Sequence, residues 1–519
     1  MKLNYKRTIL VGFAFFLISA FWQAYDATIP VILTNKFGMS QTWSGVIMAL
    51  DNILAVFMLP IFGALSDKCR SPKGKRTPFI TIGTIIASIA LVCLSFVDAG
   101  QLSSISDVAA IDDPAALAVI YDKQADKTLQ TPEGEEFVLS EVMSKETFTS
   151  ITTKTVNADG TEDANPDYAN YVAPARQACA AEATAQQPVF LILFVVLLLA
   201  VLISMAIFRS PAVALMPDVT IKPLRSKANA IINLMGTAGG ILVLVLGMVF
   251  ATSAVKNAMM SYTLYYGVVA AIMLGALGIF KLTVKEPKWA AQMQEESARL
   301  GIDETEPVET GEKRRLNKAE KRSLILILAS IALWYIGYNA VTSKYSLYAS
   351  AVLGMDYNST LLLAQAAAII SYLPAGIVAS KIGRKKTILA GVVMLASAFA
   401  LASFMRMGSS PALMNVLFAL AGIGWATINV NSFPMVVEMC SGADIGKYTG
   451  YYYTASMAAQ IITPMFSGYL MDLPGLGMTV LFPYAAIFVA LAFVTMYFVK
   501  HGDSRPESKK GLEALDIDD

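Results

Sequence analysis

The stretch GALSDKCRSPKGKRTPF occupies residues 63–79 and joins two apolar runs, 42–65 and 77–97. It gathers lysines, arginines, two glycines and the carboxylate Asp67 in a short polar turn. Glycine permits the tight turn and the close approach of helices that such a connection requires. The flanking runs have about the 20 residues that a membrane-spanning helix needs. The stretch therefore predicts a short basic loop between two membrane-spanning helices.

The composition of the whole chain agrees with a membrane protein. Of its 519 residues, 55% are hydrophobic and only 15% are charged, and the mean hydropathy is +0.56. Soluble domains carry about 25% charged residues. We therefore predict an all-α integral membrane protein with twelve spanning helices. The expected spans are 8–34, 42–65, 77–97, 188–216, 226–253, 262–283, 323–349, 358–380, 387–406, 411–437, 447–471 and 478–499.

The positions of lysine and arginine predict the orientation, because basic loops stay on the cytoplasmic side. Most of the 40 basic residues fall in the segments that are cytoplasmic if the N-terminus is inside. The first apolar run is longer than the core of a signal peptide, which has about 7–15 residues, so we expect it to be retained. The sequence predicts a multi-pass protein of the cell membrane with both termini in the cytoplasm.

The spans form two related halves. Gly74–Thr77 is matched by Gly383–Thr387, and the charged turn 218–227 is matched by 438–447 with the same spacing. A parallel six-plus-six repeat with a long linker is the architecture of major facilitator transporters. The expected domains are an N-terminal half (1–97 and 188–283), an insert (98–187), a cytoplasmic linker (284–322), a C-terminal half (323–500) and a cytoplasmic tail (501–519).

The insert 98–187 is strongly acidic, with 16 acidic and 5 basic residues, and it lacks a spanning run. Its richness in alanine, threonine, aspartate and glutamate leaves two alternatives open, a small extracytoplasmic subdomain or a partly disordered cap. In both cases we expect the insert to be peripheral to the twelve-helix body.

The spacing DxCRSxxGxRxPF, which begins at Asp67, resembles the signature of major facilitator sugar symporters. It is similar to the plant sucrose transporters with their animal and bacterial relatives and, more distantly, to the glycoside-pentoside-hexuronide symporters. Further matches lie at Pro30, Phe37–Met39, Pro211–Asp218 and Arg225–Ala230. The resemblance covers the twelve-helix body but not the insert, and it implies a carrier of sugars.

Two features of those families are missing here. Plant sucrose transporters carry an arginine two residues after the proline that Pro211 matches, whereas this chain has Val213 there and Arg209 two residues before the proline. Melibiose carriers have two carboxylates where this chain has Leu59 and Ala55. Neither the sucrose-specific arginine nor the sodium-coordinating pair is therefore carried over.

Ionisable residues inside a membrane are costly and usually functional. Asp26 and Asp51 are predicted to face one cavity in the outer half and to couple a cation, whereas Arg209 is expected nearer the inner end, too far from Asp26 for a direct pair. The structural alternatives are a helix-end cap at Asp26, a hydrogen-bonding role for Asp51 and a tie between helices at Arg209. The candidate gating residues are Asp67, Arg76, Arg209, Asp218, Arg225, Glu438 and Lys447.

Sugar recognition needs aromatic faces and hydrogen-bonding groups in a largely apolar cleft. The spans contain such side chains, although tryptophans near helix ends are usually interfacial anchors. The candidate substrate-binding residues are Trp22, Gln23, Tyr25, Asp26, Tyr338, Asn339, Gln365, Trp425, Asn429 and Gln460.

Together these features predict a secondary transporter that moves a glycoside or oligosaccharide with a cation. A proton is preferred over sodium, because isolated carboxylates remain and the sodium pair is missing. No phosphate-binding GxxxxGK[ST] motif occurs, and the single histidine, His501, lies in the tail. We therefore expect no cofactor, no metal centre and no enzymatic site, and the net charge of +1 argues against a nucleic-acid partner.

The alternatives to a sugar symporter are an exporter of amphipathic small molecules and a transport-incompetent sensor. The expected partners are a small sugar, a coupling ion and the lipid bilayer, with the protein a monomer.

Overall fold

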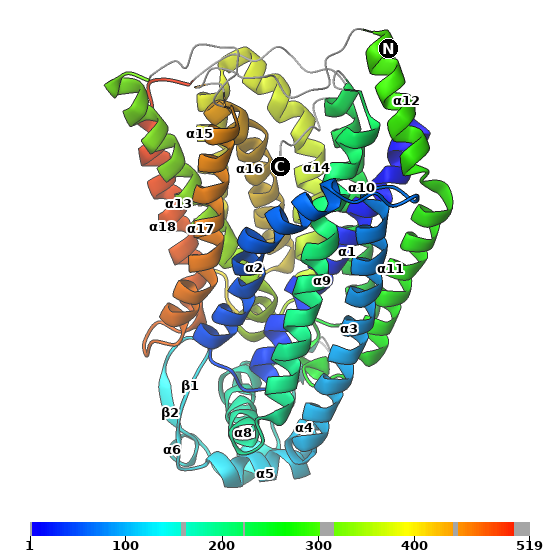
Figure 1. Ribbon diagram of the computed structural model, residues 1–519. Helices are drawn as coiled ribbons and strands as arrows, with labels where there is room; N and C mark the ends of the chain where they lie inside the picture. Colours follow the sequence, from blue (N-terminus) through cyan, green and yellow to red (C-terminus); the bar gives the residue numbers. More distant parts are fainter. Residues whose placement is uncertain are drawn as a thin grey trace.

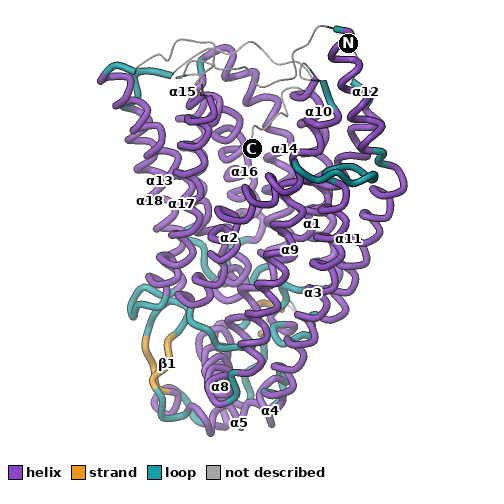
Figure 2. Tube along the Cα trace, viewed as in Figure 1, coloured by secondary structure: helices purple, strands orange, loops and turns teal. Residues whose placement is uncertain are grey.

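Long helices run side by side along one axis of the molecule, and the insert covers one end of them (Figure 1). The computed structural model describes residues 3–156, 162–221, 224–300, 316–437, 439 and 445–502. The end that carries the insert is called the insert end below. The opposite end, where the N-terminus lies, is called the linker end (Figure 1). Helices account for nearly all of the bundle, and among the described residues strands occur only in the insert (Figure 2).

Twelve long helices form the bundle in the described part of the chain. Eleven of them are long and apolar enough to cross a membrane; the twelfth, α17 (Ile445–Met471), is 27 residues long but falls outside that set. The N half contains α1 (Tyr5–Asn35), α2 (Gln41–Asp67), α3 (Thr77–Ser104), α9 (Val189–Val219), α10 (Arg225–Val249) and α11 (Thr263–Thr283). The C half contains α13 (Lys318–Tyr348), α14 (Tyr357–Ile382), α15 (Arg384–Ala402), α16 (Pro411–Val437), α17 (Ile445–Met471) and α18 (Leu481–Tyr497).

The predicted spans match these helices to within a few residues, with one larger difference at α3. The helix was expected to end at residue 97, but it continues to Ser104. Two polar side chains in this extension are buried and paired: Asp98 binds Lys36, and Gln101 donates a hydrogen bond to the Lys36 carbonyl. Polar residues that look like loop residues in the sequence therefore continue the helix, because their partners are supplied by the end of α1.

Helix starts are fixed by local capping. The side chain of Ser40 accepts a hydrogen bond at the start of α2, and Asp356 does the same at the start of α14. Asn317 and Glu320 cap α13 reciprocally, an arrangement known as a capping box. Shorter elements complete the bundle: α12 (Glu286–Arg299) follows α11, η3 (Val255–Asn257) precedes α11, η4 (Ala349–Leu353) extends α13, and η6 (Met478–Val480) precedes α18.

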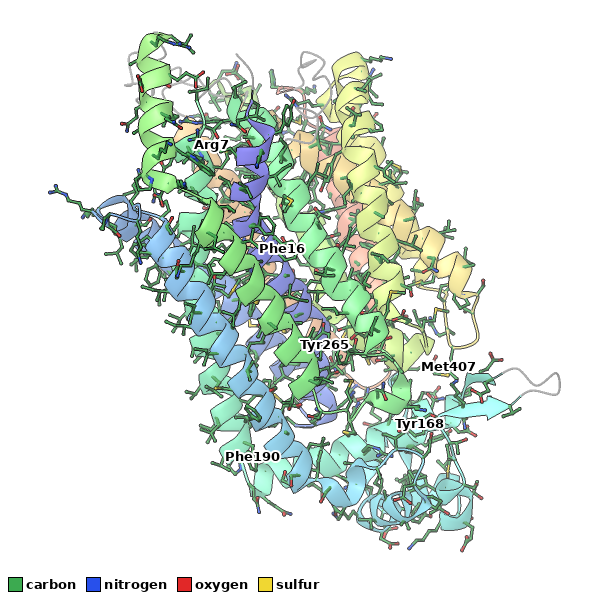
Figure 3. All side chains as sticks on the ribbon, turned by 90° about the vertical axis from the view of Figure 1, so that its right-hand side faces the viewer. Arg7, Phe16, Tyr168, Phe190, Tyr265 and Met407 are labelled. Carbon is green, nitrogen blue, oxygen red and sulfur yellow. The ribbon has the colours of Figure 1, made fainter. Side chains whose placement is uncertain are left out.

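Each half has its own hydrophobic core. Phe21 and Tyr266 are among the fully buried residues of the N-half core, and Trp334 and Phe482 are among those of the C-half core. Close helix packing depends on glycine in the N half, because a Cβ atom on Gly239 of α10 would lie 2.4 Å from the Phe16 carbonyl oxygen of α1. Figure 3 shows Phe16 midway along the bundle, between Arg7 near the linker end and Tyr168 at the insert end.

The described residues of the insert form a folded subdomain with a small core of its own. Ile120, Leu139, Phe148 and Val172 are fully buried in that core. Two antiparallel hairpins, β1–β2 and β3–β4, extend from it, with Leu129 opposite Phe137 in the first. Its elements are α4 (Ser106–Ala109), α5 (Pro114–Gln124), β1 (Thr128–Gln130), β2 (Glu136–Val138), α6 (Leu139–Val142), α7 (Lys145–Thr149), β3 (Lys154–Val156), β4 (Glu162–Ala164), η1 (Tyr168–Val172) and α8 (Ala173–Gln186).

Candidate substrate site and gates

Asp26 of α1 lies where α1, α2 and α13 face one another. It is close enough to Asp51 of α2 and to Tyr338 of α13 for their charges and dipoles to interact. Asp26, Asp51 and Tyr338 are all only partly buried. The structure therefore brings the two predicted coupling carboxylates together, and places one of them beside an aromatic residue of the other half.

An aromatic platform lies next to Asp26. The ring of Tyr338 stacks flat on Trp425 of α16, with 3.6 Å between the ring centroids and 4° between the planes. Tyr335 meets the same tryptophan edge-on, at 5.2 Å. Trp425 is partly buried. Trp334, which precedes Tyr338 by one turn of α13, is fully buried in the C-half core. Of the two, only Trp425 keeps part of its surface available for a ligand.

Two glutamines join the halves, and one of them, Gln23, lies about one turn from Asp26 along α1. Gln365 of α14 donates a hydrogen bond from Nε2 to Oε1 of Gln23 on α1, at 2.6 Å. Gly240 of α10 leaves room for the pair, because a Cβ atom there would lie 3.4 Å from Gln365 and 3.8 Å from Gln23. The pair places two amides, which can each donate and accept hydrogen bonds, at the boundary between the halves.

Trp22 and Tyr25 lie on the same helix as Asp26 and contact each other edge-on, with 5.4 Å between ring centroids. The indole N–H of Trp22 and the hydroxyl of Tyr25 are buried and have no hydrogen-bond partner among the described residues. The Arg209 guanidinium lies 5.8 Å from the centroid of the Trp22 ring, and its charge also acts on Asp51. Arg209 is thus part of the central group of residues, although the sequence suggested a place nearer the inner end; no ion pair joins it to Asp26 in the described chain.

Three other predicted site residues have weaker links to this group. The Asn339 side chain donates to the backbone carbonyl of Tyr335 on its own helix, at 2.8 Å. Asn429 of α16 and Gln460 of α17 are partly buried. Among the described residues, no hydrogen bond connects either of these two side chains to Asp26 or to the glutamine pair.

At the linker end, Arg76 is the centre of a polar cluster formed by the loop after α2. Its Nε donates to Asp218 of α9 at 2.7 Å, and its other two nitrogens donate to Ser66 and Asp67. Burial acts to lower the pKa of Arg76, but Asp218 and Asp67 outweigh it and raise the pKa above its ordinary value. Arg76 is 5% exposed, Asp218 19% and Asp67 60%, so Asp218 is the better shielded of its two carboxylate partners.

Glu286, the first residue of α12, holds the start of α3 and was not predicted. Its carboxylate accepts hydrogen bonds from the backbone N–H groups of Arg76, at 2.9 Å, and Thr77, at 2.8 Å, and from the Thr77 hydroxyl, at 2.7 Å. Gly74 has a φ of +108°, and a Cβ atom there would lie 2.2 Å from Glu286 Oε2. An anionic side chain at a helix N-terminus satisfies free N–H groups and interacts favourably with the helix dipole.

Of the remaining gating candidates, Arg225, Glu438 and Lys447, the structure describes the side chain of Arg225 alone. Arg225 donates to the backbone carbonyls of Pro217 and Thr220, at 3.1 and 3.2 Å, and so closes the turn between α9 and α10. Glu438 and the side chain of Lys447 lie outside the described residues. The gating role of all these residues stays a prediction.

A cavity of about 610 Å³ lies between α2, α9 and α17, toward the linker end. Asp67 borders it from the N half, and Tyr453 and Met457 border it from the C half. Both halves thus line an open cavity toward the linker end, and Asp67 of the Arg76 cluster borders it.

At the insert end the halves are joined by several polar contacts, one of which is fully buried. Lys344 of α13 is fully buried and donates to the Gln41 carbonyl at 2.7 Å. Asp472, which follows α17, accepts from the backbone N–H groups of Gln41 and Thr42 at 2.8 and 2.7 Å. Ser253 donates to Asp356 at 2.5 Å. These contacts hold the two halves together at the insert end.

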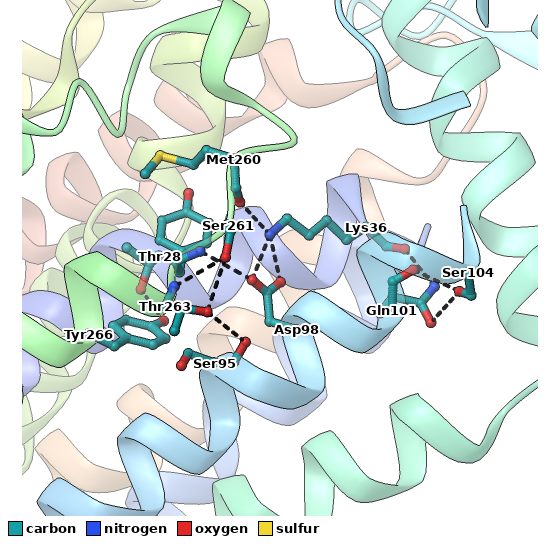
Figure 4. A network of polar contacts seen from close by, with 11 residues as sticks. Thr28, Lys36, Ser95, Asp98, Gln101, Ser104, Met260, Ser261, Thr263 and Tyr266 are labelled. Carbon is teal, nitrogen blue, oxygen red and sulfur yellow. Dashed lines mark hydrogen bonds and ion pairs between the residues drawn. The ribbon is translucent and has the colours of Figure 1, made fainter. Parts of the chain in front are cut away.

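A buried ion pair lies at the insert end of the N half (Figure 4). Lys36 Nζ lies 2.7 Å from both carboxylate oxygens of Asp98 and donates to the Met260 carbonyl at the same distance. Both charged side chains are fully buried. The pair joins the end of α1 to α3 and to the loop before α11, and its partners are all within the N half.

Comparison with known proteins agrees with this architecture. The family model described as Major Facilitator Superfamily matches residues 173–372 and 361–516, and the model described as MFS/sugar transport protein matches residues 10–102. Two similar proteins from Arabidopsis thaliana match over 74 residues, 14% of this chain: sucrose transport protein SUC3 at 38% identity and sucrose transport protein SUC4 at 28%. The match spans only 12% and 14% of the lengths of these relatives.

Solved structures show the same fold at low sequence identity. The xylose transporter XylE from E. coli, in an inward-open conformation, has 14% identity and a TM-score of 0.58, with 99% of both chains covered. An inward-facing bacterial homologue of the human lysosomal transporter Spinster has 13% identity and a TM-score of 0.58, covering 96% of this chain and 97% of the other. The nucleoside transporter NupG has 14% identity and a TM-score of 0.50, covering 96% and 100%.

Proposed function

Because this chain belongs to the Major Facilitator Superfamily and is a membrane transporter rather than an enzyme, we propose that it carries a glycoside or oligosaccharide together with a cation. The observation that supports this proposal most is the group formed by Asp26, the Tyr338–Trp425 stack and the Gln23–Gln365 pair. It lies at the boundary between the two halves and combines an aromatic face, two amides and a carboxylate. Those are the groups that bind the apolar faces and hydroxyls of sugars.

An unpaired polar group nearby suits the same substrate. A buried donor without a partner costs about 1–3 kcal/mol, so a ligand that supplies an acceptor stabilises the site. The Trp22 N–H is such a group: it lies about one turn from Asp26, and the Trp22 side chain is only partly buried, so a sugar hydroxyl can satisfy it. Tyr25 is 2% exposed and belongs to the N-half core, which does not support its predicted contact with the sugar.

The coupling ion in this proposal is a proton. Asp26 and Asp51 are carboxylates of the membrane-spanning region whose charges interact, and one of the two can bind and release a proton. As the site alternates between the two sides of the membrane, that carboxylate binds a proton on one side and releases it on the other. The proposal places a monomer in the cell membrane with the linker end in the cytoplasm, where the positive-inside distribution puts it.

The test is uptake by purified protein in proteoliposomes, with a panel of radiolabelled glycosides at several pH values and sodium concentrations. We expect accumulation that follows the proton gradient. Asp26→Asn should keep binding and exchange but lose uphill accumulation, and Asp51→Asn should show a weaker form of the same defect. Asp107→Asn, an exposed aspartate of the insert, is the matched control and should behave as wild type.

Three outcomes would overturn this proposal or a part of it. Accumulation that follows sodium and ignores pH would exclude the proton as the coupling ion. Uphill accumulation by Asp26→Asn would exclude Asp26 as the coupling residue. Efflux of amphipathic compounds without uptake of any glycoside would instead favour an exporter.

A further inference from the structure

The turn of the β1–β2 hairpin in the insert lies against the loop that joins α17 to α18 in the C half (Figure 1). Gly475 donates its backbone N–H to the Gly134 carbonyl at 2.7 Å, and Met478 donates to the Pro132 carbonyl at the same distance. Gln130 adds a hydrogen bond from its side chain to the Leu473 carbonyl, at 3.2 Å. The insert therefore binds the half of the bundle to which it does not belong.

The two backbones approach so closely that glycine is required on both sides. A Cβ atom on Gly134 would lie 2.5 Å from the Gly477 nitrogen, and one on Gly477 would lie 2.3 Å from the Gly134 nitrogen. Both glycines also have positive φ angles, +94° and +57°. An ion pair between Glu133 and Arg406, at 3.3 Å, flanks the contact, but both side chains are about half exposed, so it contributes little.

The other side of the insert is fastened to the N half. Gln177 of α8 donates to the Asn35 side chain at the end of α1, at 3.0 Å, and Gln101 of α3 donates to Thr184 of α8, also at 3.0 Å. A Cβ atom on Gly38 would lie 2.3 Å from the Ala181 nitrogen, so α8 rests directly on the turn after α1. Since α3 and α9 lead into and out of the insert, the subdomain moves with the N half.

We propose that the β1–β2 hairpin is a latch that holds the insert end closed. Opening this end separates the N half from the loop between α17 and α18, which breaks the two backbone hydrogen bonds at the hairpin turn. The latch therefore stabilises the conformation with a closed insert end over the conformation with an open one. The inference rests on alternating access, but it does not depend on which substrate or ion is carried. It also revises the expectation that the insert is peripheral.

A buried position between the halves can report opening. Ser467 of α17 is 1% exposed, and its neighbour Gly468 packs against α2, where a Cβ atom would lie 2.2 Å from the Gln41 carbonyl oxygen. A Ser467→Cys variant, with the native cysteines Cys69, Cys93, Cys179 and Cys440 changed to serine, should react slowly with a water-soluble maleimide when the insert end is closed. In detergent micelles this measurement needs neither a substrate nor a known orientation.

Gly134→Ala in this background should raise the labelling rate of the cysteine at position 467 by about tenfold, the shift expected from loss of two hydrogen bonds of ordinary net strength. Gly408→Ala is the matched control: Gly408 also has a positive φ, +83°, and lies in a C-half loop, but nothing is within 4 Å of its added Cβ. The control should leave the labelling rate unchanged.

A double-mutant cycle separates the latch from general disruption. Gly477→Ala breaks the same contact from the other side, so the double variant should label no faster than the faster single variant. Circular dichroism and size-exclusion chromatography identify variants that are folded. Unchanged labelling in folded Gly134→Ala would overturn the latch, as would additive effects of the two substitutions. Failure of sugar uptake with an intact labelling result would count against the proposed substrate alone.

Discussion

Lys344 of α13 donates a hydrogen bond to the backbone carbonyl of Gln41, 2.7 Å away at the start of α2. The two residues belong to different halves, and the lysine is fully buried. Asp472 binds the free N–H groups of Gln41 and Thr42 at the same helix end, where a carboxylate interacts favourably with the helix dipole. The start of α2 is thus held by a lysine and an aspartate of the C half.

Replacing this lysine should weaken the contact between the halves. Lys344→Met leaves the buried Gln41 carbonyl without its side-chain donor, a loss of about 1–3 kcal/mol. We expect a lower midpoint of thermal unfolding in detergent. The control is Lys123→Met, which removes an exposed ion pair with Asp107 and should change the midpoint little. Equal midpoints for both variants would contradict the role assigned to Lys344.

The geometry of the Arg76 cluster predicts which of its two carboxylates matters more for the rate of transport. Asp67→Asn should slow transport and leave the fold intact, and Asp218→Asn should slow it more, because Asp218 is 19% exposed and Asp67 60%. Loss of a charge-assisted hydrogen bond of about 1.5–3 kcal/mol shifts a two-state equilibrium more than about tenfold. Turnover in proteoliposomes measures the effect. Wild-type turnover in both variants would show that the cluster is not a gate.

Glu286 should be important for the fold of the linker end. Glu286→Gln keeps one oxygen acceptor but loses the charge that faces the start of α3, where three hydrogen bonds converge on a side chain that is 2% exposed. We expect a lower midpoint of thermal unfolding. Glu295→Gln, on an exposed position of the same helix, is the control. If Glu286→Gln unfolds no earlier than this control, the carboxylate does not stabilise the loop.

The aromatic platform predicts a binding defect. Trp425→Ala removes the ring that stacks on Tyr338, and we expect a half-saturation concentration for uptake that is higher by about tenfold, since an aromatic contact contributes about 0.5–1.5 kcal/mol beyond its buried area. Trp425→Phe should restore part of the affinity. Trp43→Ala serves as the control, because Trp43 is 61% exposed. Unchanged half-saturation in folded Trp425→Ala would remove Trp425 from the site.

The contact between the halves at the insert end should become less stable at low pH. Burial acts to raise the pKa of Asp356, but hydrogen bonds from Ser253, Ser359 and Asn358 outweigh it and hold the pKa below its ordinary value. A lowered pKa in the folded state means stabilisation that is present above the ordinary aspartate pKa, about 3.9, and is lost as the pH falls below it. The unfolding midpoint should therefore drop in that range, and Asp356→Asn should reduce the drop. The control is Asp113→Asn, at the exposed start of α5, which should leave the drop in the unfolding midpoint unchanged.

The sequence predicted the helices well, because each apolar run is long and is bounded by polar residues. It also predicted the neighbourhood of Asp67 and Arg76, since both lie in one short loop. Lys344 carries a usable signal in the sequence, since it is an ionisable residue inside an apolar run. Glu286 carried none: it is far from Arg76 in the sequence, and only the path of α12 brings them together. The hairpin contact was equally hidden, because two of its hydrogen bonds join backbone groups, which leave no mark on the residue types.

The hairpin contact has a consequence for how this protein can vary between species. Because Gly134 and Gly475 meet through backbone atoms, most neighbouring side chains can be exchanged without loss of the hydrogen bond. Only positions such as Gly134 and Gly477, where the chains touch, are restricted to one residue type. The sequence of the insert can therefore diverge widely among related chains while the contact with the loop between α17 and α18 is kept. We expect the pair of glycines to be the feature that such chains share.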